Sequence, residues 1–560
     1  MLDNSQQPRV YDMLARAFIN ERIDVCFGLL GDANMKWAAR LAEAGCRMVY
    51  VRHEHCAVAA SMAYARKSGR VGVATVTCGP GLTQTMTALP AAVYARLPLV
   101  VFVGEAPLRS GWYNQGIDQA PFVKAAGAAY RPLHTIERMA MEARDAFLQA
   151  QEERRPVVLG VPMDLQEDRW TGDDLPAPSY KVRTPPKPVP PHPDDLAVAA
   201  SMIGEARRVI VLAGLGAAAP AAAQSARALA VRVDGILATT LPARGLFHED
   251  PFSAGIAGGL AAPAAKQVYA EADLIVAVGT SLAFHTSMAG RLWPKAKVLQ
   301  INTEARTVSE GRVCADYFMR ADATMTLDAL NAALPERLAE WRSDALAKRF
   351  RAAPFSDYEP QPSPDGAHDP RSAVEALQAA LPRHWQLVNT SGHVSYFTTQ
   401  MPGRPQDAFL TIREFGAIGN GTSFAMGVAA ARPDTPVVLL DGDGSFLMHS
   451  QELDTIRRSR MKILVVVLND GAYGSEIHKL RAHGLTEEGA VFGRPDLAQI
   501  ARGFGLEGHT LTDLGDLPKI IDAFAKGDRA MVVNIPISDQ VLSPAMQRRI
   551  EEVRTKLSAN

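Results

Sequence analysis

The sequence has 560 residues, of which 47% are hydrophobic and 21% charged, and its formal net charge at pH 7 is −1. This length is enough for about three domains of ordinary size, and the composition is typical of globular proteins with large buried cores. The near-neutral charge and the lack of a basic tract argue against a nucleic-acid partner.

The cysteines and the apolar runs exclude further classes. The five cysteines show no C-x-x-C spacing, which favours a reducing compartment and argues against a structural zinc site; they are Cys26, Cys46, Cys56, Cys78 and Cys314. The N-terminal "MLDNSQQPRV" lacks the basic and apolar regions of a signal peptide. Apolar runs such as 463–468 are far too short to span a bilayer. We therefore expect a cytoplasmic protein with no membrane partner.

Short apolar runs alternate with helical patterns along nearly the whole chain, as in parallel sheets flanked by helices. In the first third, helical patterns at 35–45 and 54–69 separate the expected strands 25–31, 47–52, 71–77 and 97–104. The middle third contains the expected strands 208–214, 234–240, 273–279 and 297–302. The last third contains the expected strands 386–391, 436–442, 462–469 and 530–536.

Two proline-bearing stretches divide this pattern. The first, 184–193, predicts a stiff and exposed linker, and the second is the polar break at 353–370. The sequence therefore predicts an α/β protein of three doubly wound parallel-sheet domains, spanning 1–183, 194–340 and 368–560.

The middle third carries a glycine motif after its first expected strand. Residues 214–219, "GLGAAA", match the dinucleotide fingerprint G-x-G-x-x-A. The fingerprint also requires an acid at the end of the next strand, but Asp234 comes before that strand. A tight strand-to-helix turn is therefore favoured over a nicotinamide site.

The last third has two acidic glycine turns, "GDG" at 442–444 and "NDG" at 469–471, separated by 24 residues with a helical pattern and a strand. If the two strands are neighbours in a parallel sheet, both turns lie at the edge where such sheets bind ligands. Free backbone N–H groups in such a turn can hold a phosphate. Asp443 and Asp470 can hold Mg²⁺, which then bridges to the phosphates.

This spacing resembles the cofactor motif of thiamine-diphosphate enzymes of the acetolactate synthase, pyruvate decarboxylase and benzoylformate decarboxylase superfamily. The resemblance covers almost the whole chain and implies a pyrimidine-binding domain, a middle domain and a diphosphate-binding domain. It implies that Mg²⁺ is held by Asp443, Asp470 and the main-chain carbonyl of Ala472. The family usually has Asn at the position of Asp470; the aspartate keeps an oxygen ligand for Mg²⁺ but adds a negative charge, so we expect a stronger Mg²⁺ dependence.

Two further motifs fit the same family. "RHEHCAVAASMAYAR" at 52–66 resembles its "RHE" helix, in which Glu54 would exchange a proton with N1′ of the aminopyrimidine. "EFGAIGNGTSFAMG" at 414–427 resembles the loop in which an apolar residue, here Ile418, holds the cofactor bent, and the Gly416 carbonyl accepts the 4′-amino proton. From the residues alone, Glu54 could instead be a first-turn helix acid stabilised by the dipole, and Ile418 a buried core residue.

The remaining cofactor contacts are also implied by the resemblance. "NTSGHVSYF" at 389–397 matches the first diphosphate loop, and "CGPG" at 78–81 matches the turn near the pyrimidine. The expected contacts from these loops and from the two acidic turns are Gly79, Pro80, Ser391, Gly392, His393, Gly442, Gly444, Ser445, Tyr473 and Gly474. The family builds each active site between two subunits, so we expect a homodimer or homotetramer.

Four residues bear on the reaction. "GDANM" at 31–35 and the position of Glu476 resemble the two catalytic acids of pyruvate decarboxylase, so Asp32 and Glu476 could form an acid–base pair over the substrate. Alternatively, Asp32 caps the helix beginning near Met35, and Glu476 pairs with Lys479 on a helix surface. Gln115 resembles the substrate-facing glutamine of acetolactate synthases and benzaldehyde lyase.

Departures from the family pattern keep several reactions open. The adjacent histidine pair of pyruvate decarboxylase is missing from 111–121, and "GSEIHKL" replaces the "GMVxQW" signature of acetolactate synthases. The arginine that contacts FAD in acetolactate synthases is also missing, which argues against FAD without excluding it. The leading hypothesis is a 2-oxo acid decarboxylase or carboligase. The alternatives are a lyase that cleaves a 2-hydroxyacyl (acyl-CoA) substrate, a benzaldehyde-lyase-like enzyme, and a non-catalytic relative that keeps the fold.

Overall fold

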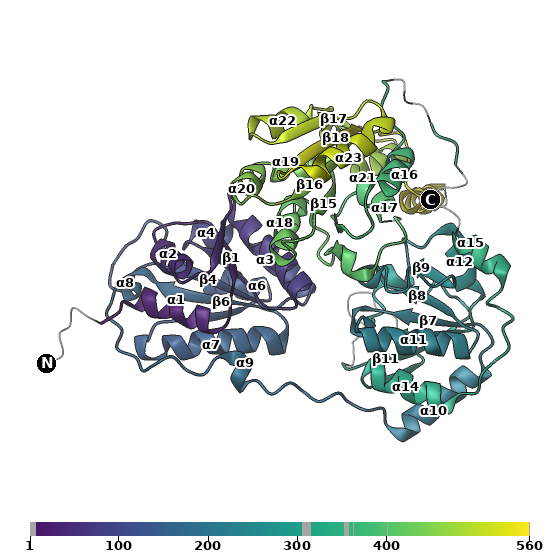
Figure 1. The fold of residues 1–560 in the computed structure, drawn as a ribbon, viewed down its shortest axis with the longest axis horizontal. Helices are drawn as coiled ribbons and strands as arrows, with labels where there is room; N and C mark the ends of the chain where they lie inside the picture. The colour runs from purple at the N-terminus through teal and green to yellow at the C-terminus, as the bar shows by residue number, and fades with distance from the viewer. Residues whose placement is uncertain are drawn as a thin grey trace.

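The computed structural model describes residues 7–304, 315–351, 358–361, 363, 365–399 and 401–558. Cys314 and most of the 353–364 part of the predicted second break therefore lie outside the described residues. The chain forms three lobes, with the third lobe above and between the first two in Figure 1. Each lobe contains a six-stranded sheet in which all strand pairs are parallel.

The first sheet has the strand order β2-β1-β3-β4-β6-β5. Its strands are β1 Val25–Gly28, β2 Arg47–Tyr50, β3 Gly72–Val76, β4 Leu99–Glu105, β5 Ala129–Pro132 and β6 Pro156–Pro162. The helices are α1 Val10–Asn20, α2 Met35–Glu43, α3 Glu54–Ser68, α4 Pro80–Thr83, α5 Ala88–Tyr94, α6 Ala120–Ala125, α7 Ile136–Glu153, α8 Met163–Gln166 and α9 Ser179–Val182. The central strands are buried on both faces, which explains their unbroken apolar sequences.

The middle sheet has a different order, β12-β11-β10-β7-β8-β9. Its strands are β7 Val209–Ala213, β8 Ile236–Thr239, β9 Ser253–Ile256, β10 Leu274–Val278, β11 Lys297–Asn302 and β12 Tyr317–Arg320. Its helices are α10 Pro193–Glu205, α11 Pro220–Arg232, α12 Pro263–Glu271, α13 Phe284–Ser287, α14 Ala323–Ala333 and α15 Asp344–Arg351. The prolines at 184–192 form an extended connection from α9 to α10, as predicted (Figure 1).

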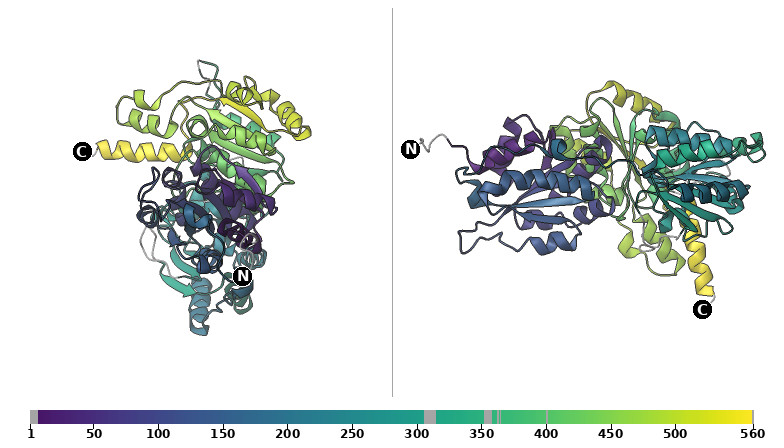
Figure 2. Two further views of the ribbon diagram at one scale, coloured as in Figure 1. Left: turned by 90° about the vertical axis from the view of Figure 1, so that its left-hand side faces the viewer. Right: turned by 90° about the horizontal axis from the view of Figure 1, so that it is seen from below.

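The third sheet has the order β14-β13-β15-β16-β18-β17, which is the topology of the first sheet again. Its strands are β13 Gln386–Asn389, β14 Phe409–Thr411, β15 Val437–Gly442, β16 Ile463–Asn469, β17 Glu507–Thr510 and β18 Met531–Pro536. Its helices are α16 Pro370–Ala380, α17 Val394–Thr398, α18 Gly421–Ala431, α19 Asp443–Met448, α20 Glu452–Arg458, α21 Gly474–Ala482, α22 Leu497–Gly503, α23 Leu517–Lys526 and α24 Pro544–Ser558. The last helix, α24, projects from the body of the molecule (Figure 2).

Helices α3 and α18 join the first lobe to the third. Small residues allow the two helices to approach closely, since a Cβ on Gly427 would lie 2.1 Å from the carbonyl oxygen of Ala60. Both helices are buried along most of their length, and one hydrophobic core extends across them into both sheets. Within the described ranges, no helix is long and apolar enough to cross a membrane.

Candidate active site

The two acidic turns lie side by side at the carboxyl edge of the third sheet. Strands β15 and β16 are neighbours, with Gly442 opposite Leu468, so the prediction that both turns share one sheet edge is confirmed. The Asp443 carboxylate accepts N–H bonds from Gly444 at 2.8 Å and from Gly471 at 2.7 Å. Asp470 accepts the N–H of Ala472 at 3.3 Å. The two carboxylates thus face a common space between the turns.

Both carboxylates are buried, with 1% of Asp443 and 7% of Asp470 exposed. Burial raises the pKa of Asp443 to about 6, and burial together with the Asp443 charge raises the pKa of Asp470 well above its usual value. Two buried acids this close share a proton in the absence of a cation, and a cation between them would let both carboxylates ionise; oxygen donors of this kind suit Mg²⁺. Among the described residues no group of three or more acidic, histidine or cysteine side chains could hold a metal, so further ligands would have to be main-chain or cofactor oxygens.

Glycines make room around this pair. A Cβ on Gly474 would lie 2.5 Å from Oδ2 of Asp470 and 3.1 Å from Nδ1 of His393. A Cβ on Gly444 would lie 2.7 Å from Cε1 of Tyr473, whose ring packs against Phe492. Any larger residue at 444 or 474 would displace these neighbours, so the glycines are required by the close packing.

The predicted diphosphate loop, 389–397, adjoins the GDG turn. Thr390 donates a hydrogen bond of 2.6 Å to Asp441, a buried acid whose pKa is raised to about 7, chiefly by burial. The Ser391 hydroxyl is buried and has no hydrogen-bond partner in the described structure. Gly392 has a φ of +103°, which favours glycine. An unpartnered hydroxyl in this loop fits a phosphate acceptor, so the donor set matches the expected cofactor.

His393, the last of the cofactor contacts expected from this loop, bonds and packs within the third domain. Its Nε2 accepts the N–H of Ser543 at 3.1 Å, and its ring packs against Phe397 and His478. Burial lowers the pKa of His393 to about 3, which keeps the ring neutral. The histidine thereby anchors the segment that leads into α24. Its assignment as a cofactor contact stays a prediction.

The loop 414–427, called the predicted wedge loop because Ile418 is expected to hold the cofactor bent, is bonded to the same edge of the sheet. Gly419 donates its N–H to the hydroxyl of Ser445 at 2.9 Å. A Cβ on Gly392 would lie 4.0 Å from Cγ2 of Ile418, so the wedge residue lies beside the diphosphate loop. Gly416 has a φ of +73°, a conformation that glycine adopts without strain. The fold brings the three predicted loops of this domain together.

Glu54 is the first residue of α3, half-buried, and burial raises its pKa. It stands between two histidines that contact the third domain. His55 Nε2 lies 2.6 Å from Oδ1 of Asn420, and the His55 and His449 rings stack with centroids 5.0 Å apart. The ring of His53 lies 5.2 Å from that of His449. Sequence reasoning missed this cluster because His449 lies almost 400 residues from His53 and His55 in the sequence.

The first domain gathers the other expected contacts at the CGPG turn. The Cys78 thiol lies 3.5 Å from Oε1 of Gln115. Gly79 has a φ of +57°, and a Cβ there would lie 2.1 Å from the backbone oxygen of Gln115. Gly79 also donates its N–H to Oε1 of buried Gln119 at 2.9 Å, while Pro80 begins α4. Sequence reasoning missed Gln119, because nothing but its place in the Gln115 loop marks it.

The alternatives for the two predicted catalytic acids have different outcomes. Asp32 is exposed and does not cap α2, whose N-cap is Asn34, so the capping alternative is wrong. Burial is the main cause of the raised pKa of Cys78, and the negative charge of Asp32 adds to it. Asp32 therefore lies near the CGPG turn. Glu476 forms an ion pair of 2.9 Å with Lys479 on α21, as the surface alternative predicted. Catalytic roles for both acids stay predictions.

The glycine motif of the middle domain is explained by packing. A Cβ on Gly214 would lie 2.3 Å from the oxygen of Gly279, and a Cβ on Gly216 would lie 2.7 Å from the Gly279 Cα. The two turns therefore touch backbone to backbone, and this close approach explains the glycines. Asp234 accepts the N–H groups of residues 340–342 and is 5% exposed. This supports the tight-turn interpretation.

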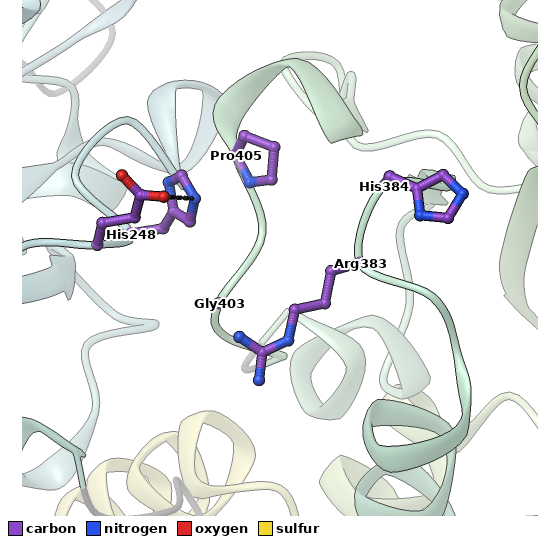
Figure 3. Close-up of a pocket in the computed structure, with 6 residues that line it drawn as sticks. His248, Arg383, His384, Gly403 and Pro405 are labelled. Atoms are coloured by element: carbon purple, nitrogen blue, oxygen red, sulfur yellow. Dashed lines mark ion pairs between the residues drawn. The ribbon is translucent and has the colours of Figure 1, made fainter.

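A separate groove of roughly 520 Å³ lies between the middle and third domains. Figure 3 shows its lining, with His248 on one side and Arg383, His384, Gly403 and Pro405 on the other. His248 also pairs with the neighbouring Glu249 at 3.7 Å. The groove contains none of the predicted site residues.

Three family models match the chain in the order of its three sheets. The N-terminal TPP-binding domain of thiamine pyrophosphate enzymes matches residues 8–122, the central domain 196–330 and the C-terminal TPP-binding domain 390–535. The chain therefore belongs to the thiamine-pyrophosphate-dependent enzymes of the acetolactate synthase and decarboxylase superfamily.

Known relatives align over nearly the full chain. A Pseudomonas aeruginosa protein named "Probable 2-ketoarginine decarboxylase AruI" is 30% identical, over 91% of this chain and 90% of its own. An acetolactate synthase large subunit of Parasynechococcus marenigrum is 28% identical, over 88% of this chain and 81% of its own. The isozyme 2 large subunit of acetolactate synthase from Escherichia coli is 25% identical, over 92% and 93%.

Proposed function

We propose that this chain is a thiamine-diphosphate- and Mg²⁺-dependent enzyme that acts on a 2-oxo acid, by decarboxylation, carboligation or both. The observation that carries the proposal is the buried Asp443–Asp470 pair at adjacent strand ends, beside the unpartnered Ser391 hydroxyl. In our proposal Asp443, Asp470 and the carbonyl of Ala472 hold the metal. Ser391 and the glycine turns at 442–444 and 474 hold the diphosphate.

When bound, thiamine diphosphate supplies a carbanion that attacks the carbonyl carbon of the substrate. Glu54 holds a proton for the aminopyrimidine, and its raised pKa suits a group that must exchange that proton. Ile418 would pack against the bound cofactor, and the turn at Gly79 and Pro80 would border it. Gln115, Asp32 and Glu476 face the substrate in this proposal, with the acids moving the proton that completes the product.

The proposal includes a second copy of the chain. The resemblance implies active sites shared between two subunits, so we propose that Glu54 of one copy completes the site of the Asp443–Asp470 pair of another. Apolar side chains in the Gln115 loop and nearby are exposed, including Leu108, Ile117 and Phe122, and Trp112 is 78% exposed. Such a surface suits burial against another copy. Size-exclusion chromatography with light scattering should give a dimer or tetramer, and a monomer would contradict this part.

The reaction is tested with purified protein loaded with thiamine diphosphate and Mg²⁺. A panel of 2-oxo acids is supplied while CO₂ and the organic products are followed by mass spectrometry. We expect CO₂ release from at least one acid, and its loss in Glu54→Ala. Turnover of no 2-oxo acid by the wild type, with Glu54→Ala behaving identically, would overturn the enzymatic proposal.

A further inference from the structure

A buried arginine of the middle domain reaches into the third domain. Arg244 follows β8, after the short helix η2 (Leu241–Ala243), and is 3% exposed. Its Nη2 donates a hydrogen bond of 2.5 Å to Oδ1 of Asn389, and its Nη1 donates one of 3.2 Å to the carbonyl oxygen of Thr399. The guanidinium also lies 3.8 Å above the ring of Phe409. All of these contacts cross from the middle to the third domain.

The two acceptors lie at the two ends of one loop. Asn389 is the last residue of β13, and Thr399 follows α17. Asn389 also donates to the hydroxyl of Thr398 at 2.5 Å, which closes the base of the loop from within. Between these ends lies the predicted diphosphate loop with Ser391. Arg244 therefore holds the base of that loop from outside the domain.

This placement is costly for the protein. No carboxylate among the described residues pairs with Arg244, and burial, with Arg413 and Arg404 nearby, lowers its pKa to about 9. A buried cation that served packing alone could be replaced by apolar side chains at little cost. The rigid fork of a guanidinium can bond two acceptors at once, as Arg244 bonds Asn389 and Thr399. Its positive charge also lies next to the loop that is predicted to bind the anionic diphosphate.

Close backbone packing also joins the middle and third domains next to Arg244. Gly245 has a φ of +85°, and a Cβ there would lie 2.4 Å from the oxygen of Arg404. Arg413 bonds the Thr399 hydroxyl at 3.4 Å from the wedge-loop side. Thr399, at the end of the loop, is therefore bonded by both Arg244 and Arg413. A substitution at Arg244 should for this reason alter the position of the loop.

We propose that Arg244 is a positioning residue that holds the predicted diphosphate loop, 389–397, in the conformation that binds the diphosphate. The inference rests on the proposed function. It adds a role for the middle domain in cofactor binding, exerted through Asn389 and Thr399.

The test measures thiamine diphosphate affinity, not activity. Full-length protein freed of cofactor is titrated with thiamine diphosphate at saturating Mg²⁺ by calorimetry. In Arg244→Lys the charge remains, but the shorter side chain lacks the rigid planar fork that bonds Asn389 and Thr399 together, so the dissociation constant should rise about tenfold. Arg342→Lys is the matched control, because Arg342 also lies over a phenylalanine, Phe252, but stays within the middle domain. Its dissociation constant should stay within twofold of the wild type.

A second variant tests the route. Asn389→Ala removes the acceptor without touching the middle domain, and should raise the dissociation constant by a similar factor. The double variant should weaken binding by less than the two single effects combined, because both single variants remove the shared Arg244–Asn389 bond. If circular dichroism shows that Arg244→Lys does not fold, the thiamine diphosphate affinity of Asn389→Ala alone tests the inference. Tight wild-type binding with unchanged affinity in these variants would overturn the inference, whereas no binding by the wild type would overturn the proposed function.

Discussion

The carboxylate of Asp443 accepts a hydrogen bond of 2.7 Å from the backbone N–H of Gly471, 28 residues further along the chain. This bond joins the two acidic turns across the edge of the third sheet. It also holds Asp443 beside Asp470, so that the two buried carboxyl groups lie close together. Burial and the nearby Asp443 charge raise the pKa of Asp470. The consequences of this arrangement for metal binding can be measured.

Replacing Asp470 by Asn removes one of the two facing charges. We expect Asp470→Asn to lower Mg²⁺ affinity about tenfold, because an amide oxygen is a weaker ligand for a hard cation than a carboxylate. The affinity is measured by titrating Mg²⁺ at fixed thiamine diphosphate and following cofactor binding. An unchanged Mg²⁺ affinity would argue against the stronger Mg²⁺ dependence expected from the aspartate at 470.

Replacing Gly474 by Ala introduces a Cβ 2.5 Å from the Asp470 carboxylate. That contact must relax by moving Asp470 or His393, so Mg²⁺-dependent cofactor binding should weaken by tenfold or more. Gly503→Ala is the control, since a Cβ on Gly503 meets nothing within 4 Å. If both variants bind the cofactor equally well, the close packing at 474 does not position the proposed ligand.

Replacing Glu54 by Gln keeps the size of the side chain but removes its exchangeable acid. The rate of deuterium exchange at C2 of bound thiamine diphosphate, followed by NMR in D₂O, should fall by a factor on the order of 10²–10⁴. The exposed Glu43, replaced by Gln, should leave the rate unchanged. This measurement needs no substrate, and wild-type exchange in Glu54→Gln would refute the assigned role.

His55 should make stability depend on pH. Burial, and then the charges of His449 and His53, outweigh its bond to Asn420 and lower its pKa from 6.5 to about 4. Between about pH 4 and pH 6.5, the His55 imidazole is protonated in the unfolded chain but stays neutral in the folded protein. The free energy of unfolding should therefore be highest above pH 6.5 and fall as the pH drops toward 4, by up to about 3 kcal/mol from this group.

Urea unfolding at pH 7.5 and pH 5 checks the His55 prediction. In His55→Gln the difference between the two pH values should shrink, because the group that takes up the proton is gone. Replacing the exposed His384 by Gln should leave the difference as in the wild type. Equal pH dependence in wild type and His55→Gln would show that the buried imidazole is not responsible.

The fold was largely predictable because buried parallel strands leave unbroken apolar runs. The runs at 436–442 and 462–469 became β15 and β16, and their adjacency followed from parallel α/β architecture. Shorter or half-exposed strands such as β5 and β17 were not predicted, because partial burial leaves no such run. The Asp32 cap was predicted wrongly, because Asn34 two residues later supplies the N-cap.

The class of protein was predictable from the sequence, because the spacing of the two acidic turns along one strand–helix–strand unit is a local property that resembles a known family. Asp443 and Asp470 became candidates through that spacing, and Glu54 through the resemblance of 52–66 to the family's helix motif. Only the tertiary structure decided which distant residues meet. The Arg244–Asn389 bond and the stacking of His55 on His449 join segments more than 100 residues apart, and such contacts leave no periodic pattern in the chain.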